Sequence, residues 1–324
     1  MSSAKLLCDE RQTTRHLLMI RPSHFGFNPQ TAESNQFQRP ATHSAAELSV
    51  QAAKEFDAVV TALDQAGVQV FVVADVPYGG TPDAVFPNNW ISTHSDGTVV
   101  LYPIAAANRR AERRPDILER LALEGGFQVR RVIDLSGLEQ SGMPLEGTGS
   151  LVLDRLHGIA FAARSGRTHA DALAEFARLT GYRVVAFNAS VGAGQPVYHT
   201  NVMMSLGRQL AVLCSDSIGD LAERRAVCTE LAASNRQMLI LTASQVQEFA
   251  ANCLEVDAPG GPLLVLSETA RRSLRPAQRR VLERHTALLP VDVTTIEHVG
   301  GGSVRCMLAE IYLPRSAQLD FRPV

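Results

Sequence analysis

The sequence predicts an α/β fold. Segments with the apolar, β-branched composition of strands alternate with segments of helical periodicity along the whole chain, beginning with a strand expected at residues 16–20. Of the 324 residues, 45% are hydrophobic and 20% are charged, which is an ordinary composition for a protein with a sizeable buried core. No long linker rich in proline, glycine and serine divides the chain, so we expect one domain over residues 1–324.

The order of the predicted elements indicates repeated β-β-α-β modules, about five in number. Residues 45–66 carry apolar positions at helical spacing and end before Gly67, a residue type that often follows the last turn of a helix. Residues 68–73 then form a valine-rich strand, and residues 202–206 and 210–214 are expected to pair as a hairpin. The remaining strands are expected at residues 98–103, 128–135, 150–153, 159–163, 183–187, 238–241, 263–266 and 286–291, and the remaining helices at residues 109–124, 170–180, 219–234, 244–252, 277–285 and 307–312.

Composition and charge exclude several classes of function. The formal net charge is -2, which gives no reason to expect nucleic acid or an anionic membrane as a partner. No segment approaches the ~18 consecutive apolar residues of a membrane span, and residues 1–15 lack the apolar core of a signal peptide. The five cysteines have no short regular spacing, so neither a zinc site nor a disulfide framework is indicated. We therefore expect a cytoplasmic protein without metal that binds a small molecule, and the sequence allows a homodimer.

Cys306 follows three consecutive glycines at residues 300–302. Glycine lets the backbone approach a neighbour closely, and the start of the helix expected at residues 307–312 would favour a thiolate at Cys306. A nucleophilic cysteine needs both features. The alternative is a small buried apolar residue after a loop, which is the commoner role of a free cysteine.

Three other segments carry polar residues of catalytic type. Glu146 lies in Leu-Glu-Gly-Thr-Gly-Ser, just before a predicted strand, where the alternative is a solvated turn. In Tyr-His-Thr-Asn, an extended backbone would point His199 and Asn201 to the same face. An imidazole beside an amide suits acid–base chemistry, and the alternative is a structural histidine. Asn88 and Asn89 lie in Phe-Pro-Asn-Asn-Trp, where the alternative is an ordered turn packed on an aromatic residue.

In order and in motif, these four segments resemble the guanidine-modifying enzyme superfamily, also called the amidinotransferase or pentein group. The family pattern runs from an aromatic-Thr-Arg-Asp segment through Glu-Gly-Gly and His-x-Asp to a glycine-rich loop with a cysteine. The wider pattern is most similar to the bacterial citrulline-utilisation hydrolases, and it includes Met-Ile-Arg-Pro at residues 19–22, Phe-Gly-Phe-Asn-Pro at residues 25–29 and Ile-Tyr-Leu-Pro at residues 311–314. The resemblance implies a five-module α/β-propeller, in agreement with the modules predicted above.

The resemblance also implies a catalytic group of three residues. Cys306 would be the nucleophile and His199 the general acid and base. Glu146 would orient His199 and bind a substrate nitrogen. No metal or organic cofactor is implied.

Two arginines complete the site that the resemblance implies. Arg167 lies at the family's Arg-Thr position, where an arginine binds the α-carboxylate of the substrate, because a guanidinium matches a carboxylate in bidentate geometry. Arg110 is similar to a second carboxylate-binding arginine, and Arg109 is the alternative. Both could also be surface residues on a helix.

The sequence departs from the family at two positions. Relatives that act on arginine-type substrates place carboxylates beside the cationic guanidinium, whereas this chain has Asn89 and Asn201, with Asn88 as the alternative register for the first. A buried guanidinium without a counter-charge is unfavourable, while an amide donor suits a neutral ureido group. We therefore expect hydrolysis of citrulline to ornithine, carbon dioxide and ammonia through a covalent adduct on Cys306.

Two other classes of function stay open on the sequence. One is a guanidino enzyme, namely an arginine deiminase, a dimethylarginine hydrolase or an amidinotransferase. The other is a pentein without catalytic activity that serves as a binding module. The joint presence of Cys306, His199 and Glu146 argues against the second class.

Overall fold

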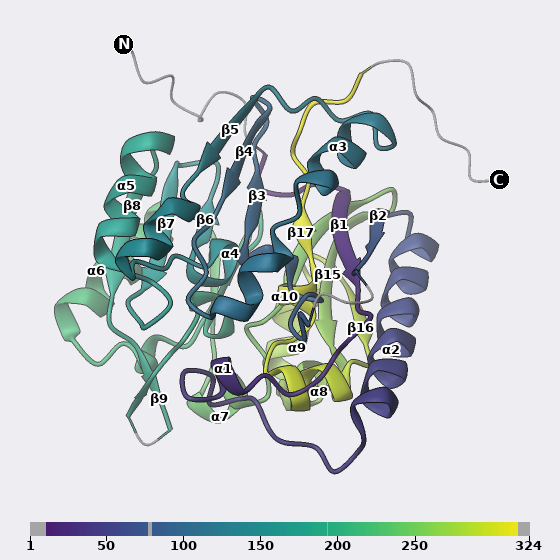
Figure 1. Ribbon diagram of the computed structural model, residues 1–324. Helices are drawn as coiled ribbons and strands as arrows, with labels where there is room; N and C mark the ends of the chain where they lie inside the picture. Colours follow the sequence, from purple (N-terminus) through teal and green to yellow (C-terminus); the bar gives the residue numbers. More distant parts are fainter. Residues whose placement is uncertain (1–10, 77–79, 193, 317–324) are drawn as a thin grey trace.

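The computed structural model describes residues 11–76, 80–192 and 194–316, which form a mixed α/β fold (Figure 1). Cys8 and most of the polar segment at residues 1–15 lie outside the described residues. Within them, five three-stranded sheets share one pattern, in which the middle strand pairs antiparallel with one neighbour and parallel with the other. The sheets are β17-β1-β2 (Ala309–Glu310, His16–Arg21, Gln69–Ala74), β3-β4-β5 (Ile91–Thr93, Thr98–Leu101, Arg131–Asp134), β6-β7-β8 (Val152–Asp154, Ile159–Ala163, Arg183–Phe187), β11-β12-β13 (Met204–Leu206, Leu210–Leu213, Gln237–Ile240) and β14-β15-β16 (Leu254–Ala258, Gly261–Ser267, Ala287–Val291).

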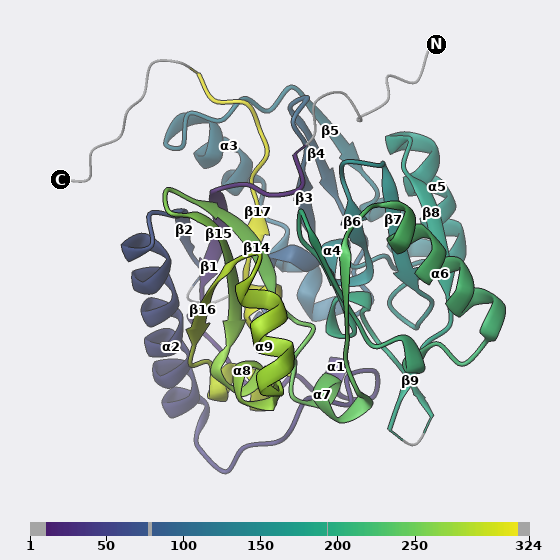
Figure 2. The same ribbon diagram turned by 180° about the vertical axis from the view of Figure 1, so that it is seen from behind.

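A helical connection joins the two parallel strands of each sheet, since parallel neighbours cannot be linked by a tight turn. Figures 1 and 2 show the longer helices on the outer side of the sheets. A small hairpin of β9 (Ser190–Val191) and β10 (Gln195–Pro196) is added after the third sheet. The connecting helices are α2 (Ala45–Gln65), α3 (Pro115–Leu123), α5 (Ala170–Thr180), α6 (Leu221–Ala233), α8 (Glu268–Ser273) and α9 (Pro276–Glu283), and α1 (Pro29–Ala32) and α7 (Ala243–Gln247) are shorter.

The first sheet joins the two ends of the chain. Strand β1 pairs in parallel with β2, and on its other edge it pairs antiparallel with β17, with Leu17 opposite Glu310 and Leu18 opposite Ala309. In the other four sheets, the antiparallel edge strand comes just before the middle strand in the sequence. In this sheet, the antiparallel edge strand β17 comes from the other end of the sequence. This closure brings the segment with Cys306 beside the N-terminal strand.

Helix α2 illustrates how the sequence determines an element locally. Ser44 caps its N-terminus in a reciprocal capping box with Glu47. Apolar residues at helical spacing, including Phe56 and Val59, are fully buried along one face. They pack in one apolar cluster with residues of β1 and β15, so burial of this face attaches the helix to two sheets.

Four predicted elements are wrong in type or extent. Residues 307–312 are not a helix, because the backbone from Ala309 pairs with β1 as strand β17. The helix expected at residues 109–124 divides into a 3₁₀ segment, Ala107–Glu112, and α3, since Pro115 disfavours helical geometry at the residue before it. The helix expected at residues 244–252 ends at Gln247.

Residues 198–202 are the fourth, because a 3₁₀ turn, Thr200–Val202, replaces the extended backbone expected there. Four short strands, β3, β9, β10 and β14, were missed. In the described part of the chain, no helix is long and apolar enough to cross a membrane.

We expect Phe56→Ala to lower the free energy of unfolding by about 3–5 kcal/mol, because the ring is fully buried between α2 and two sheets. Urea unfolding followed by circular dichroism would measure the change. The matched control is Leu123→Ala at the exposed end of α3, where the side chain is 78% exposed and a change within about 0.5 kcal/mol is expected. Equal effects of the two substitutions would contradict the assignment of Phe56 to the core.

Candidate active site

Four one-turn helices bring the sequence motifs together. They are η1 (Pro87–Asn89), α4 (Gly147–Ser150), η4 (Thr200–Val202) and α10 (Val304–Met307), and each ends two positions before the first residue of an antiparallel edge strand, β3, β6, β11 or β17. Helix α4 contacts both η1 and η4, and α10 contacts η1. Equivalent positions of four sheets therefore place the motif residues around one point, although they span more than 200 residues of sequence.

A small cavity lies at this meeting point. Its volume is about 10 Å³, close to the space that one water molecule needs. The cavity must widen before a molecule the size of an amino acid can enter. The lining residues are Asn35, Asp83, Phe86, Asn89, Arg109, Arg167, Tyr198, His199, Gly300, Gly302 and Cys306.

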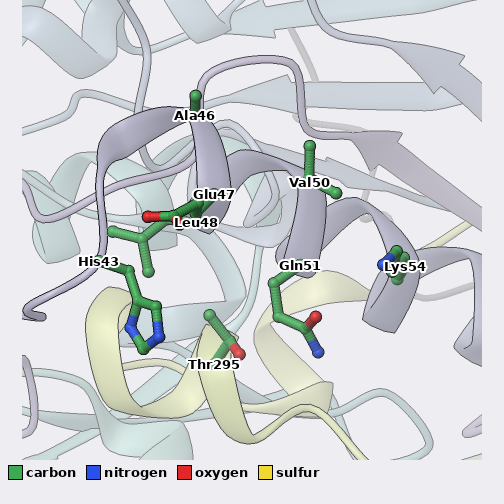
Figure 3. A pocket seen from close by; sticks show the side chains of 8 residues that line it. All are labelled: His43, Ala46, Glu47, Leu48, Val50, Gln51, Lys54 and Thr295. Atoms are coloured by element: carbon green, nitrogen blue, oxygen red, sulfur yellow. The ribbon is translucent and has the colours of Figure 1, made fainter.

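A larger surface hollow of about 610 Å³ lies elsewhere, beside the first turns of α2 (Figure 3). None of its residues belongs to a motif, and it shares none with the small cavity. Its lining is His43, Ala46, Glu47, Leu48, Val50, Gln51, Lys54 and Thr295. The candidate active site is therefore the small cavity.

Cys306 is buried, with 3% of its surface exposed, and its sulfur faces two carboxamides. Asn201 Nδ2 lies 3.5 Å from Sγ, and Asn252 Nδ2 lies 3.4 Å from it. The cysteine is in the single turn of α10, where its own N–H donates to Ser303 O at 2.9 Å. The expected position at the start of a longer helix is therefore wrong, and side-chain amides are the polar groups in contact with the sulfur.

The three glycines before Cys306 allow close packing, as the sequence predicts. Gly301 has a φ of 64°, and a Cβ there would lie 2.6 Å from Asn35 Nδ2. At Gly300 and Gly302, a Cβ would come within 3.0 Å of the Phe86 ring. The close neighbours are thus the segment around Asn35 and the aromatic residue of the first motif.

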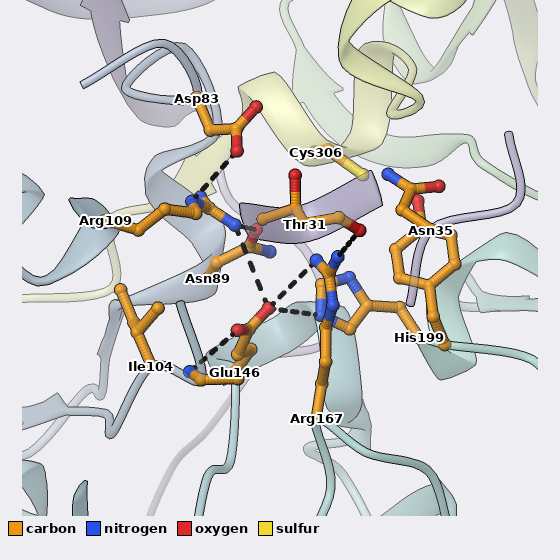
Figure 4. Close-up of polar contacts among 12 residues, drawn as sticks. Thr31, Asn35, Asp83, Asn89, Ile104, Arg109, Glu146, Arg167, His199 and Cys306 are labelled. Atoms are coloured by element: carbon orange, nitrogen blue, oxygen red, sulfur yellow. Dashed lines mark hydrogen bonds and ion pairs between the residues drawn. The ribbon is translucent and has the colours of Figure 1, made fainter. Parts of the chain in front are cut away.

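Glu146 is the central charge of the site (Figure 4). Its Oε2 accepts from His199 Nε2 at 2.8 Å and from an Arg167 nitrogen at 3.4 Å, and an Arg109 nitrogen lies 3.8 Å away. Its Oε1 accepts from the N–H of Ala105 at 3.1 Å. Burial alone would raise the pKa of Glu146, but Arg167, the His199 hydrogen bond and Arg109 together hold that pKa well below its usual range. The Glu146 carboxylate is therefore ionised, and both of its oxygens accept hydrogen bonds from protein groups.

His199 is held on three sides. Its Nε2 is bonded to Glu146, and its ring packs against Tyr198 with 4.6 Å between centroids. Gly149 lies against the ring, so that a Cβ there would be 2.7 Å from Nδ1. Burial lowers the pKa of His199 to about 4, against the opposing effect of Glu146. At neutral pH the imidazole is uncharged, and Nδ1 is the nitrogen free to accept a proton.

Arg167 links Glu146 to the N-terminal segment around Thr31 and Ser34. Its guanidinium donates to Ser34 Oγ at 2.8 and 3.0 Å, to Thr31 O at 3.2 Å and to Glu146. It also lies over the Tyr198 ring, 4.9 Å from the centroid. Arg167 thus lines the cavity as predicted from the sequence, and it ties the segment around Thr31 to the site.

Of the two arginines considered from the sequence, Arg109 lines the cavity and Arg110 does not. Arg109 is 2% exposed and donates to Asn89 Oδ1 at 2.9 Å and in bidentate fashion to Glu112, with both distances 2.9 Å. The Arg110 side chain is 39% exposed and pairs with Glu139 at 3.3 Å. The choice of Arg110 as a site residue is therefore corrected to Arg109, because the 3₁₀ backbone of η2 (Ala107–Glu112) points the two side chains to different sides.

The two asparagines of the first motif are bonded to each other. Asn89 Nδ2 donates to Asn88 Oδ1 at 2.9 Å, while Asn89 Oδ1 accepts from Arg109. Asn89 lines the cavity, whereas Asn88 does not, and Asn88 Nδ2 has no hydrogen-bond partner in the part of the chain that the structure describes. The sequence-based register that places Asn89 at the site thus agrees with the geometry.

Sequence reasoning missed three buried residues of this region. Asp83 lines the cavity, and its Oδ2 accepts from Asn28 Nδ2 at 2.7 Å and lies 3.6 Å from Arg109 Nε, while its Oδ1 has no hydrogen-bond partner among the described residues. Glu112 neutralises Arg109, and Asn252 contacts Cys306. A carboxylate three residues before Phe86 was the available signal for Asp83, whereas no local pattern marks Asn252. The described residues contain no group of three or more His, Cys, Asp or Glu side chains that could hold a metal ion.

Comparisons with known proteins find the same fold in several solved structures. Among solved structures, the N-terminal domain of ArgZ, an arginine dihydrolase of cyanobacteria, is 18% identical with a TM-score of 0.67, and the match covers 92% of this chain and 99% of that one. Unliganded AgrE is 18% identical with a TM-score of 0.71, covering 94% of this chain and 40% of AgrE. A dimethylarginine dimethylaminohydrolase adduct is 14% identical with a TM-score of 0.62, covering 92% and 99%. A comparison with curated protein sequences gave no match.

The mixed α/β fold, together with a family model that matches most of the chain, defines the class of protein as the pentein superfamily. A family model described as N,N dimethylarginine dimethylhydrolase, eukaryotic, matches residues 21–313. The chain therefore belongs to the N,N dimethylarginine dimethylhydrolase family.

We expect Gly149→Ala to lower turnover by about a hundredfold, because the new methyl group would overlap the His199 ring and the Asn89 amide at 2.7 Å. Ammonia release measures turnover, and thermal unfolding checks that the variant is folded. Gly137→Ala is the matched control, since no heavy atom lies within 4 Å of a Cβ at that position. Undiminished turnover in folded Gly149→Ala would show that the ring position is not critical.

The burial of neutral His199 predicts a pH dependence of stability. Its pKa is about 4 in the folded protein against 6.5 as the ordinary value, so the unfolded chain binds a proton that the folded chain excludes between these values. Stability is complete above pH 6.5 and falls as the pH decreases towards 4, by at most about 3 kcal/mol from this group.

Urea unfolding between pH 4.5 and 7 would test this pH dependence. The free energy of unfolding of His199→Gln should decrease less at low pH than that of the wild type. The window excludes the titration of Glu146 below pH 4.5. His24→Gln, at an exposed histidine, is the control and should leave the profile unchanged. An unchanged profile in His199→Gln would contradict the burial of a neutral imidazole.

Proposed function

We propose that this protein is a cysteine-dependent hydrolase that converts citrulline and water into ornithine, carbon dioxide and ammonia. The observation that carries the proposal is the set of uncharged amides around the reactive sulfur. Asn201 and Asn252 contact Cys306 Sγ, and Asn89 lines the same cavity. An amide can donate to the oxygen of a neutral ureido group and accept from its nitrogens.

The carboxylates of the site support the same substrate preference. Glu146 and Glu112 are each paired with buried arginines, Glu146 with Arg109 and Arg167 and Glu112 with Arg109. A substrate guanidinium would have to compete with these guanidinium groups for the same oxygens. A ureido group brings no such competition, because it carries no charge.

The rest of the cavity suits the zwitterionic end of an amino acid. Asp83 offers Oδ1, a buried carboxylate oxygen without a hydrogen-bond partner in the described part of the chain, for an ammonium group. Arg167 and Arg109 line the same cavity and can receive a carboxylate. For Arg167 this requires exchange of its bonds to Ser34 and Thr31, which also releases the N-terminal segment around them.

The proposed mechanism is covalent, with His199 transferring the protons. Neutral His199 takes the thiol proton at Nδ1, and the Cys306 thiolate attacks the ureido carbon. The imidazolium, stabilised by Glu146, returns the proton to the departing amine and leaves an S-carbamoyl-type adduct on Cys306. His199 then activates water to hydrolyse the adduct, which regenerates the thiol and releases the second amine and carbon dioxide.

The same proposal includes the arrangement of the five sheets as a propeller around the site.

A guanidino hydrolase or an amidinotransferase is the alternative. The description of the family model names dimethylarginine, and ArgZ is named an arginine dihydrolase. AgrE was solved with L-arginine and, separately, with ornithine and NAD+. This chain spans about two fifths of AgrE. Asp83, as a carboxylate without a full set of partners among the described residues, is the residue that favours a cationic ligand. A binding module without activity is disfavoured by the intact Cys306, His199 and Glu146.

We expect citrulline to be turned over with a kcat/KM about a hundredfold or more above that of arginine, because an unpaired buried cation costs several kcal/mol. Ornithine and ammonia would be measured with citrulline, arginine and N-methylated arginines. Asn201→Asp should narrow the ratio by restoring a counter-charge beside the sulfur. Cys306→Ala should abolish turnover with all substrates.

Two outcomes would contradict the proposal. Equal kcat/KM for arginine and citrulline would make the guanidino enzyme the better assignment. Turnover that survives in Cys306→Ala would remove the cysteine from the mechanism. Mass spectrometry after a slow substrate should locate the adduct on the peptide that contains Cys306.

A further inference from the structure

Asn252 lies just before the antiparallel edge strand of the fifth sheet. The four one-turn helices of the site each end two positions before the first residue of an edge strand, and Asn89, Glu146, His199 and Cys306 lie within these helices or immediately before them. In the remaining sheet the edge strand is β14, which begins at Leu254. Asn252 lies two positions before β14, at the end of a turn, so the segment before each of the five edge strands contributes a side chain to this region.

The side chain of Asn252 is fully buried and directed at the sulfur. Its Nδ2 lies 3.4 Å from Cys306 Sγ and also donates to Asn201 O at 3.1 Å. Its Oδ1 lies 3.7 Å from Sγ, in position to accept from the thiol. Asn201 has a similar relation to the sulfur, with Nδ2 at 3.5 Å and Oδ1 at 4.0 Å. Each carboxamide can therefore accept from the thiol and donate to the thiolate.

A strained turn fixes this orientation. Phe249 has a φ of 57°, which is unfavourable for a bulky side chain. The conformation closes the turn after α7, with Asn252 N–H donating to Phe249 O at 2.8 Å and Ala250 N–H to Gln245 O at 3.0 Å. The Phe249 ring packs against Phe37 with 5.2 Å between centroids. A strained backbone conformation persists where the surrounding contacts hold it in place. Here the conformation of Phe249 directs the Asn252 side chain towards Cys306.

Other sources of stabilisation for a thiolate are weak at this site. The α10 helix has only four residues, so its dipole is small. His199 is uncharged at neutral pH, because burial lowers its pKa. Within the described residues, the hydrogen-bond donors in contact with Sγ are the carboxamides of Asn201 and Asn252.

We propose that Asn252 is a catalytic residue, whose carboxamide, together with that of Asn201, binds the Cys306 thiolate and directs it for attack. Loss of one charge-assisted hydrogen bond lowers the thiolate fraction by about tenfold or more. The turnover part of this inference rests on the proposed function, but the effect on the thiol does not.

Alkylation of Cys306 by iodoacetamide tests the inference without a substrate. The sulfur forms a thioether as iodide leaves, and the thiol proton passes to the buffer, so the rate follows the thiolate fraction. The rate at each pH would be read by mass spectrometry on the Cys306 peptide. We expect Asn252→Ala to lower the rate at pH 7 about tenfold and to raise the pH midpoint by about one unit.

The isosteric variant Asn252→Asp tests whether Asn252 acts as a hydrogen-bond donor or only fills space. It keeps the volume but replaces the donor with a negative charge, so the midpoint should rise further than in Asn252→Ala. Asn88→Asp adds the same charge at a side chain that does not line the cavity and has no hydrogen bond to the sulfur, and should shift the midpoint less. Thermal unfolding of all variants measures any loss of fold.

The outcomes are distinct. An Asn252→Asp profile equal to that of wild type, or a shift in Asn88→Asp as large as in Asn252→Asp, would overturn the role of Asn252. So would a lower maximal rate with an unchanged midpoint, which is the result of a structural role alone. If the midpoints shift as expected and citrulline is not a substrate, only the proposed function fails.

Discussion

The ionised carboxylate of Glu146 holds the candidate site together. It is fully buried and is stabilised by a histidine, two arginines and a backbone amide, namely His199, Arg167, Arg109 and Ala105. A buried charge persists only when its partners replace the lost water. The partners come from three stretches of the chain, at residues 105–109, 167 and 199, so one carboxylate links these stretches and fixes which nitrogen of the imidazole is free.

The same balance divides the site into a charged part and an uncharged part. Arginines and carboxylates gather around Glu146, with Glu112 and Asp83 beside Arg109. Around the sulfur, the polar contacts are carboxamides. In the proposed function, the charged part would bind the ionic groups of the substrate and the uncharged part would face its neutral ureido carbon. This separation underlies the assignment of a ureido rather than a guanidinium substrate.

The accuracy of the sequence predictions depended on how local each cause was. Helix α5 and strand β8 have the predicted limits, because amphipathic periodicity and a glycine after the helix are local signals. The predicted helix at residues 307–312 failed because β1, some 290 residues earlier, supplies hydrogen bonds to that backbone. Asn201 reached the sulfur although its expected extended backbone is a 3₁₀ turn. Motif identity thus predicted membership of the site better than the assumed geometry did.

The sequence by itself determined the α/β class, the likeness to penteins and the residues Cys306, His199, Glu146, Arg167 and Asn89 at the candidate site, since residue type and order carry that information. The tertiary structure alone decided between Arg109 and Arg110, closed the cavity to about 10 Å³ and added Asp83 and Asn252. These depend on the direction of side chains that leave irregular turns and on contacts between modules. Neither the side-chain directions nor these contacts produce a periodic pattern in the sequence, because contacts between sheets form only when all the sheets are in place.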